Sequence, residues 1–116
     1  MAEGANTLPK TERLCGKTAT SSLLARGKWV GAAHLKCCHA PGGEVSRIMV
    51  SVPKKLFRRA VKRNLLKRRM REAYRTQKNL LGAAAQDMMF VYNSPEIADF
   101  EAIREEMAAV LGRIAR

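Results

Sequence analysis

The sequence has few of the features that mark membrane proteins or disulfide-stabilised secreted proteins. None of its apolar runs approaches the roughly 20 residues that a membrane-spanning helix requires. Its three cysteines, Cys15, Cys37 and Cys38, are an odd number, and the polar opening MAEGANTLPK does not resemble a secretory signal. Aromatic residues make up only 5% of the chain, which predicts a small core. We therefore expect a soluble cytoplasmic protein with a flexible leader at residues 1–7 and one domain at residues 8–116.

Acidic residues are also scarce, above all in residues 54–78. The chain has 22 Lys and Arg against 10 Asp and Glu, a net charge of +12. Residues 54–78 contain twelve of the basic residues and Glu72 as the one acid, so the other 91 residues carry a net charge of +1. Positive charge concentrated in one segment predicts a polyanionic partner, which is either a nucleic acid or an anionic membrane.

The pattern of apolar residues predicts an α+β fold in which the basic segment is a helix between two strands. The predicted elements are a helix over 8–26 ending near Gly27, an extended segment over 29–40, a strand over 47–52, the basic helix, a strand over 87–93, and a helix with Ser94 as its N-cap. The order strand, helix, strand indicates a βαβ unit with the basic helix as its crossover, in a two-layer sandwich.

The basic helix is predicted to divide into an apolar and a cationic side. Helical spacing places Leu66, Met70, Ala73, Leu80 and Leu81 on the core stripe, and places Arg63, Lys67, Arg71 and Arg75 on another side, flanked by Asn64, Arg68 and Lys78. Like charges four residues apart destabilise a helix, so binding explains this pattern better than stability does. A solvated face would mix Glu with Lys, and a membrane-bound helix would need its apolar stripe for lipid rather than for the core.

Nucleic acid is therefore the favoured partner, and RNA is favoured over DNA. Nearly every exposed position of the helix is a phosphate binder rather than a base reader, which suits folded RNA better than the DNA major groove. The residues expected to contact RNA are Lys54, Lys55, Arg58, Arg59, Lys62, Arg63, Asn64, Lys67, Arg68, Arg71 and Arg75.

The stretch AVKRNLLKRRMRE, residues 60–72, resembles the signature of the protein subunit of bacterial ribonuclease P. The residues that match that signature are Ala60, Val61, Arg63, Asn64, Lys67, Arg68, Arg71 and Glu72. The strand ending SVPKK and the opening LPKTERL are also similar to the family pattern. This chain departs from the family pattern at Leu65, where the family has Arg, and is one residue longer at 56–59.

The resemblance implies the element order αβββαβα, similar to a ribosomal-protein domain, with a left-handed βαβ crossover. It implies a protein that binds the ribonuclease P RNA and precursor tRNA and promotes endonucleolytic removal of the 5′ leader. In that family the chemistry belongs to RNA and Mg²⁺, so no protein catalytic residue, protein-bound metal or other cofactor is expected. The leader would occupy a cleft between the first helix and the sheet, and the candidates for it are Lys10, Arg13, Thr20, Leu24 and Trp29.

Two groups of residues resemble metal sites, and two other functions remain open. Adjacent Cys37 and Cys38 on a strand point to opposite faces, so HLKCCH, residues 34–39, is a poor zinc site. The acids Asp99, Glu101, Glu105 and Glu106 are explained by a helix start and a solvated face. The alternative functions are a non-enzymatic ribosomal or ribosome-assembly protein and a cationic protein that coats membrane or DNA.

Overall fold

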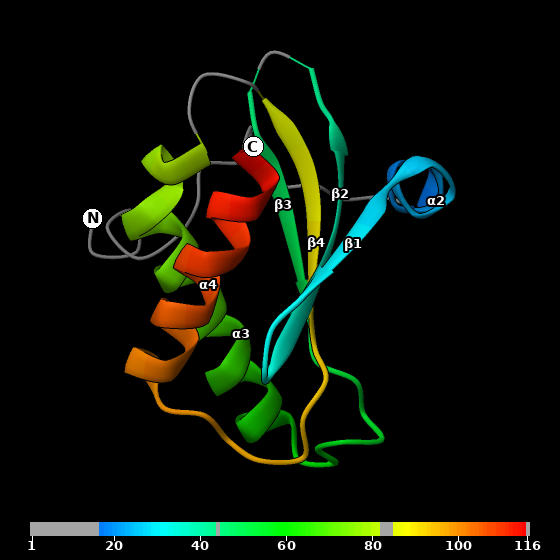
Figure 1. Cartoon of the computed structure of the whole chain (residues 1–116). Coiled ribbons are helices and arrows are strands. Elements are labelled where there is room, and N and C mark those ends of the chain that lie inside the picture. Colours follow the sequence, from blue (N-terminus) through cyan, green and yellow to red (C-terminus); the bar gives the residue numbers. More distant parts are fainter. Residues whose placement is uncertain (1–16, 44, 82–84, 116) are drawn as a thin grey trace, which may run out of the picture.

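The computed structural model describes residues 17–43, 45–81 and 85–115 (Figure 1). Along the chain they form α2 (Lys17–Arg26), β1 (Lys28–Gly31), β2 (Leu35–Pro41), β3 (Arg47–Ser51), α3 (Ala60–Gln77), the short 3-10 helix η2 (Lys78–Leu81), β4 (Gln86–Tyr92) and α4 (Phe100–Ala115). This order confirms the predicted α+β class and the succession αβββαβα. The leader at residues 1–7 and the predicted first half of the first helix, residues 8–16, lie outside the described residues.

The strands form one sheet in the order β1-β2-β4-β3. β3 and β4 are parallel, whereas β1 with β2 and β2 with β4 are antiparallel. Two parallel neighbours cannot be joined by a hairpin, so the chain needs a crossover between them, and α3 supplies it as predicted. The basic helix is thereby fixed against the sheet at both of its ends.

The main core lies between one face of the sheet and the layer formed by α3 and α4 (Figure 1). Residues that alternate along β3 and β4, such as Ile48, Val50 and Phe90, meet the apolar sides of both helices. Of the core stripe predicted on the basic helix, Leu66, Met70, Ala73 and Leu81 are buried, but Leu80 is 45% exposed. That part of the prediction was wrong because the chain changes to a 3-10 helix at Lys78, which alters the angular step between residues.

The opposite face of the sheet is covered in part by α2. Leu23 of α2 is buried with Cys38, Ala40 and Met89 in a second, smaller cluster. Cys37 belongs to the main core, so the two adjacent thiols point to opposite faces as predicted. Gly27 ends α2 because of close packing: a Cβ there would lie 2.5 Å from Cys38 Sγ.

The segment predicted as extended over 29–40 contains two strands, in agreement with the three strands expected before the basic helix. β1 and β2 form a hairpin around residues 32–34, where the amide of Ala32 donates to the carbonyl of Leu35 at 2.8 Å. Two residues of α4, Arg113 and Glu106, hold this turn. Arg113 Nη1 donates to the carbonyl of Gly31 at 2.9 Å, and His34 Nδ1 lies 2.6 Å from Glu106 Oε2.

The last helix begins five residues later than its predicted start. Ser94 does not cap it; Asp99 does, because its Oδ1 accepts the amide of Ala102 at 2.9 Å. The hydroxyl of buried Tyr92 donates to the carbonyl of Glu96 and accepts the amide of Ala98, which holds residues 94–99 as a loop.

Candidate nucleic-acid interface

The basic segment divides into a loop and a helix. Residues 54–59, which we call the basic loop, precede α3, and their four basic side chains, Lys54, Lys55, Arg58 and Arg59, are all exposed. Phe57 points the other way: it is 6% exposed, and its ring centroid lies 5.8 Å from that of Tyr92. One buried aromatic side chain therefore anchors the loop while its charges face solvent.

Arg63, predicted as an RNA contact, also holds this loop in place. Its Nη1 donates to the carbonyls of Phe57 and Arg58, each at 2.8 Å, and the side chain is half-buried. Charge-assisted hydrogen bonds to backbone carbonyls are among the stronger polar contacts. Replacing Arg63 would therefore disturb the loop as well as remove a charge.

The first turn of α3 is arranged against its own helix dipole. Arg59 occupies the N-cap with an extended backbone and no side-chain capping bond, and no acid lies in the first turn. Lys62 and Arg63 place positive charge where the dipole is already positive, which costs stability and favours an anion nearby. A phosphate close to this end would offset both costs.

The rest of α3 presents the predicted cationic side to solvent. Asn64, Arg68 and Arg71 are exposed, whereas Lys67 and Arg75 are half-buried. Arg75 is paired with Glu72 one turn earlier, so its charge is partly neutralised. Arg69, which the predicted RNA contacts did not include, donates from Nη1 to the carbonyl of Ala98 at 2.6 Å and ties α3 to the loop before α4.

Most of the predicted contacts lack an acidic partner. Within residues 17–43, 45–81 and 85–115, ion pairs involve Arg26, Arg47, Arg75 and His34 with three acids. In the same part of the chain, seven predicted RNA contacts form no ion pair and no hydrogen bond with their side chains: Lys54, Lys55, Arg58, Arg59, Lys62, Lys67 and Arg68. The loop and the helix together thus form a surface of unneutralised cations.

A second surface lies on the sheet face away from α3 and α4. Strand pairing aligns Lys36 of β2 with Val91 of β4, and Val91 with Ser51 of β3. Paired residues point to the same side, and all three are only partly buried. We call this row the open sheet face, because α2 covers the neighbouring row of Cys38 and Met89 and leaves this one accessible.

The candidates for the leader cleft border this face where the structure describes them. Thr20 of α2 is half-buried, with Oγ1 3.6 Å from Met49 Sδ, and Leu24 is 46% exposed. Trp29 on the edge strand β1 is 49% exposed. Lys10 and Arg13 lie outside the described residues, so the structure does not place them.

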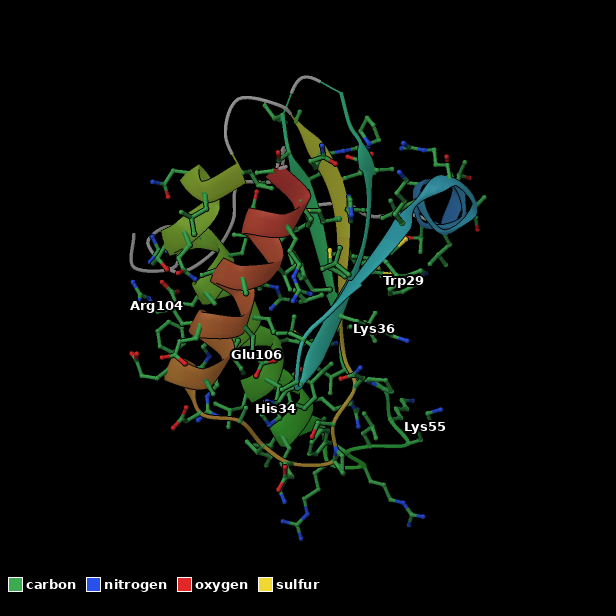
Figure 2. The ribbon with its side chains drawn as sticks, in the orientation of Figure 1. Trp29, His34, Lys36, Lys55, Arg104 and Glu106 are labelled. Carbon is green, nitrogen blue, oxygen red and sulfur yellow. The ribbon has the colours of Figure 1, made fainter. Side chains whose placement is uncertain are left out.

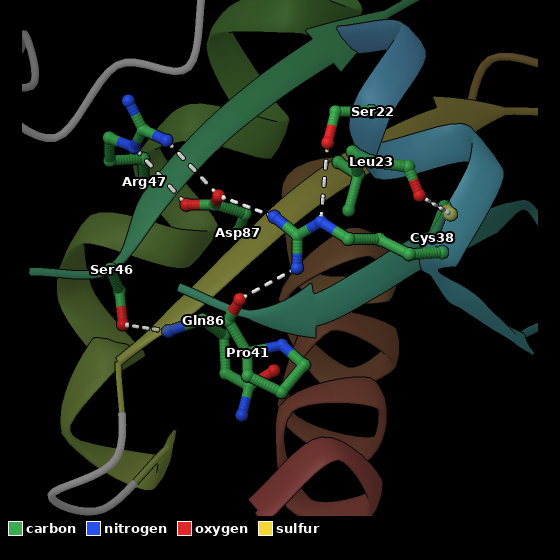
Figure 3. Close-up of polar contacts among 9 residues, drawn as sticks. Ser22, Leu23, Cys38, Pro41, Ser46, Arg47, Gln86 and Asp87 are labelled. Carbon is green, nitrogen blue, oxygen red and sulfur yellow. Dashed lines mark hydrogen bonds and ion pairs between the residues drawn. The ribbon is translucent and has the colours of Figure 1, made fainter. Parts of the chain in front are cut away.

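A buried carboxylate fixes α2 relative to the sheet (Figure 3). Asp87, which is 3% exposed at the start of β4, accepts from Arg47 Nε and Nη2 at 3.1 Å and from Arg26 Nη2 at 3.2 Å. Arg26 Nη1 also donates to the carbonyl of Pro41 at 2.8 Å. An acid at the start of a strand in a basic chain was the one sequence signal for this cluster, and it did not identify the partners of Asp87.

Two of the four acids at the last helix, Asp99 and Glu106, and the two described thiols are used in the fold. Asp99 caps α4, and Glu106 accepts the backbone amide of His34 at 2.7 Å. Within the described ranges, no three His, Cys, Asp or Glu side chains are placed to hold a metal ion. Burial raises the pKa of the Cys37 and Cys38 thiols, and the nearby Cys38 adds to the effect at Cys37, so both stay protonated and apolar in character.

No helix in the described part of the chain has the length and apolar character needed to cross a membrane.

Comparisons with known proteins match nearly the whole chain, including the basic loop and α3. The family model described as Ribonuclease P matches residues 8–115. The Ribonuclease P protein component of Porphyromonas gingivalis is 38% identical over 118 residues, covering 93% of this chain and 86% of that protein. The protein of the same name from Chlorobaculum tepidum is 40% identical over 86 residues, covering 68% of this chain and 56% of that protein.

Solved structures agree with the fold. The RNase P protein from Thermotoga maritima superposes with a TM-score of 0.78 at 27% identity, over 89% of this chain and 97% of that one. The Staphylococcus aureus RNase P protein superposes with a TM-score of 0.79 over 92% of this chain and 97% of that one, and at 24% identity it supports the fold alone. The family match over residues 8–115 includes α3 and the basic loop.

Proposed function

The chain belongs to the ribonuclease P protein family, and we propose that it acts as the protein component of the ribonuclease P ribonucleoprotein, which removes the 5′ leader of precursor tRNA. The observation that carries this is the surface of seven cations without an acidic partner on the basic loop and α3. This surface lies inside the matched residues, and its seven side chains form no ion pair or hydrogen bond within the described part of the chain. Its partner is the ribonuclease P RNA.

The cations would bind the RNA through its phosphates. Arginine forks match phosphate oxygens in two-point contacts, and Arg58, Arg59 and Arg68 are exposed and free to make them. Arg63 acts differently, because it positions the loop that presents Arg58. A row of phosphate binders of this kind reads the shape of a folded RNA rather than its base sequence.

The open sheet face would receive the single-stranded leader of precursor tRNA. Ser51 ends β3 only three residues before Lys54, so the row of Lys36, Val91 and Ser51 runs toward the basic loop. A strand of RNA held at the loop could therefore continue across this face. Figure 2 shows Lys55, Lys36 and Trp29 on the side of the sheet away from α4.

The protein would contribute binding and orientation to the endonucleolytic reaction. We propose that the RNA rather than this chain would hold the Mg²⁺ ions, which would supply activated water for hydrolysis of the phosphodiester. Four of the described acids support this assignment, because Asp99 caps a helix and Glu72, Asp87 and Glu106 pair with basic side chains. We also propose that the particle is cytoplasmic, in keeping with the three cysteines of the sequence.

The test measures cleavage of a precursor tRNA with a labelled 5′ end by a bacterial ribonuclease P RNA at low Mg²⁺, with and without the protein. Under these conditions the RNA alone should be slow, so the protein should accelerate release of an intact leader. The control replaces the RNA with an unrelated folded RNA, which should give no cleavage. If the protein binds folded RNA without accelerating cleavage, it is a ribosomal or ribosome-assembly protein instead.

A further inference from the structure

The basic loop is held as an ordered turn, although its charges repel one another. Its four cationic side chains form no ion pair or hydrogen bond within the described part of the chain. Its backbone is closed by the amides of Leu56 and Phe57, which donate to the carbonyl of Pro53 at 3.1 and 3.4 Å. Like charges in a short segment extend the chain, so the loop needs a contact outside itself to stay folded.

That contact is made by the ring of Phe57, which is buried in the main core. Its centroid lies 5.8 Å from that of Tyr92 and the two rings are tilted by 56°, an arrangement that aromatic pairs favour. Tyr92 is fully buried, and its hydroxyl donates to the carbonyl of Glu96 and accepts the amide of Ala98 at 2.9 Å. Phe57 therefore packs on a ring whose far end is fixed by two hydrogen bonds.

A second neighbour of Tyr92 is His34, at the tip of the β1–β2 hairpin. The two rings are stacked, with centroids 6.3 Å apart and an angle of 27° between their planes. Glu106 of α4 holds His34 at two points, since its Oε1 accepts the His34 amide at 2.7 Å and its Oε2 lies 2.6 Å from His34 Nδ1 (Figure 2). The hairpin tip, the end of β4 and α4 thus meet at Tyr92, and Phe57 joins the basic loop to them.

Arg63 holds the same point of the loop from α3. Its Nη1 binds the carbonyls of Phe57 and Arg58, so the side chain and the carbonyl of Phe57 are both fixed. Each of the four cations of the loop lies within three residues of Phe57. Fixing this one residue therefore limits the positions of all four charges.

We propose that Phe57 and His34 are positioning residues for RNA binding: through Tyr92, they hold the basic loop, before RNA arrives, in the arrangement in which its cations meet phosphates. The proposal rests on the proposed function and deepens it, because neither residue touches RNA itself. Ordering a single residue changes an equilibrium constant about 5- to 30-fold. A loop that is already ordered avoids this cost on binding, so the anchor should be visible in the affinity for RNA.

Limited trypsin digestion of the full chain measures whether the loop is ordered, because trypsin cuts after Lys and Arg and needs an opened segment. In the wild type, cleavage after the four basic residues of the loop should be slow. Phe57→Ala should speed it about 10-fold, as mass spectrometry of the fragments can show, and His34→Ala should speed it by a smaller factor. Unchanged tryptic cleavage of Phe57→Ala would overturn the proposal.

The affinity for labelled ribonuclease P RNA is measured by filter binding at several salt concentrations. Phe57→Ala should lower it about 10-fold at every concentration. The slope against salt should stay the same, because the variant keeps every cation and the slope counts the phosphates that are neutralised. Wild-type affinity, or a flatter slope, would contradict positioning in advance. Phe57→Leu keeps the site apolar without the ring and should lower the affinity about 3-fold, which keeps the test decisive if the alanine variant does not fold.

Ile114→Ala is the matched control, because Ile114 belongs to the same core and is also 6% exposed, but lies in the last turn of α4. It should lower the free energy of unfolding and leave RNA affinity and tryptic cleavage of the loop unchanged. An equal loss of affinity would mean that general destabilisation is the cause and would overturn the proposal. If the wild type accelerates leader removal but Phe57→Ala binds the RNA as tightly as the wild type, the positioning role is wrong and the proposed function stands. If the wild type gives no acceleration at all, the proposed function itself fails.

Discussion

The salt dependence of RNA binding should report how many cations of the basic surface meet phosphates. Each neutralised phosphate contributes about 0.7 to 0.9 to the slope of log affinity against log salt. If all seven cations without an acidic partner make such contacts, the slope is about −5 to −6. Raising the salt from about 50 to about 200 mM should then lower the affinity for ribonuclease P RNA roughly 1,000- to 6,000-fold.

Removing two of these cations should flatten the slope by a predictable amount. We choose Arg59→Ala with Arg68→Ala, because Arg59 makes no capping bond and both side chains are exposed. Five remaining contacts give a loss of roughly 100- to 500-fold over the same salt range. Arg63 is unsuitable for this test because its replacement would also release the carbonyls of Phe57 and Arg58.

The assay is filter binding of labelled RNA at several salt concentrations. Arg68→Ala alone is matched against Arg104→Ala, which removes an exposed cation from α4. Figure 2 shows Arg104 on the opposite side of the molecule from Lys55. An unchanged slope for the double variant, or the same change for Arg68→Ala and Arg104→Ala, would refute the assignment of the basic surface.

Two further predictions concern the fold beneath this surface. Gly27→Ala should lower the free energy of unfolding by about 1 to 3 kcal/mol in urea, because its Cβ would lie 2.5 Å from Cys38 Sγ and 2.7 Å from the carbonyl oxygen of Leu23; an unchanged stability would mean that α2 ends for another reason. Burial raises the pKa of Cys37 and Cys38, so iodoacetamide at pH 8 should leave both unmodified in the folded protein and modify both in urea, as mass spectrometry of the peptides can show; rapid labelling of either in the native state would contradict their burial.

Sequence patterns predicted the elements better than their boundaries. The amphipathic pattern identified α3 as the crossover, since Leu66, Met70 and Ala73 recur at helical spacing and are buried. Its start carried no usable signal, because Arg59 occupies the N-cap without a capping side chain. The sequence therefore gave no indication of where the helix begins within the basic segment, whose first six residues, 54–59, form a loop.

The start of α4 shows how a tertiary contact overrides a strong local signal. Ser94 followed by proline and an acid is a good N-terminal pattern, but the hydroxyl of Tyr92 binds backbone groups of Glu96 and Ala98. Those bonds hold the segment in a loop and leave Asp99 to cap the helix. The position of the hairpin turn at residues 32–34 was not predicted either, because the contacts that hold it come from the distant helix α4.

The candidate interface was predictable in composition and only partly in arrangement. Charge counting found the cations, but it could not distinguish Arg63, which holds the loop, from Arg68, which is exposed and unpaired. That difference depends on where the carbonyls of the basic loop point. Likewise, Trp29 and Lys36 are seven residues apart in sequence, and only the hairpin register brings their side chains together.

The distribution of acids indicates the side from which RNA approaches. Five of the ten acids lie between Glu96 and Glu106, in the loop before α4 and its first two turns, and none lies between Val45 and Arg71. Like-charge repulsion would disfavour phosphates along the start of α4, so RNA bound to α3 should extend toward the basic loop instead. From that loop the row of Ser51, Val91 and Lys36 leads across the sheet. The charge pattern that we propose binds the ribonuclease P RNA would thus also direct a single-stranded leader toward Trp29.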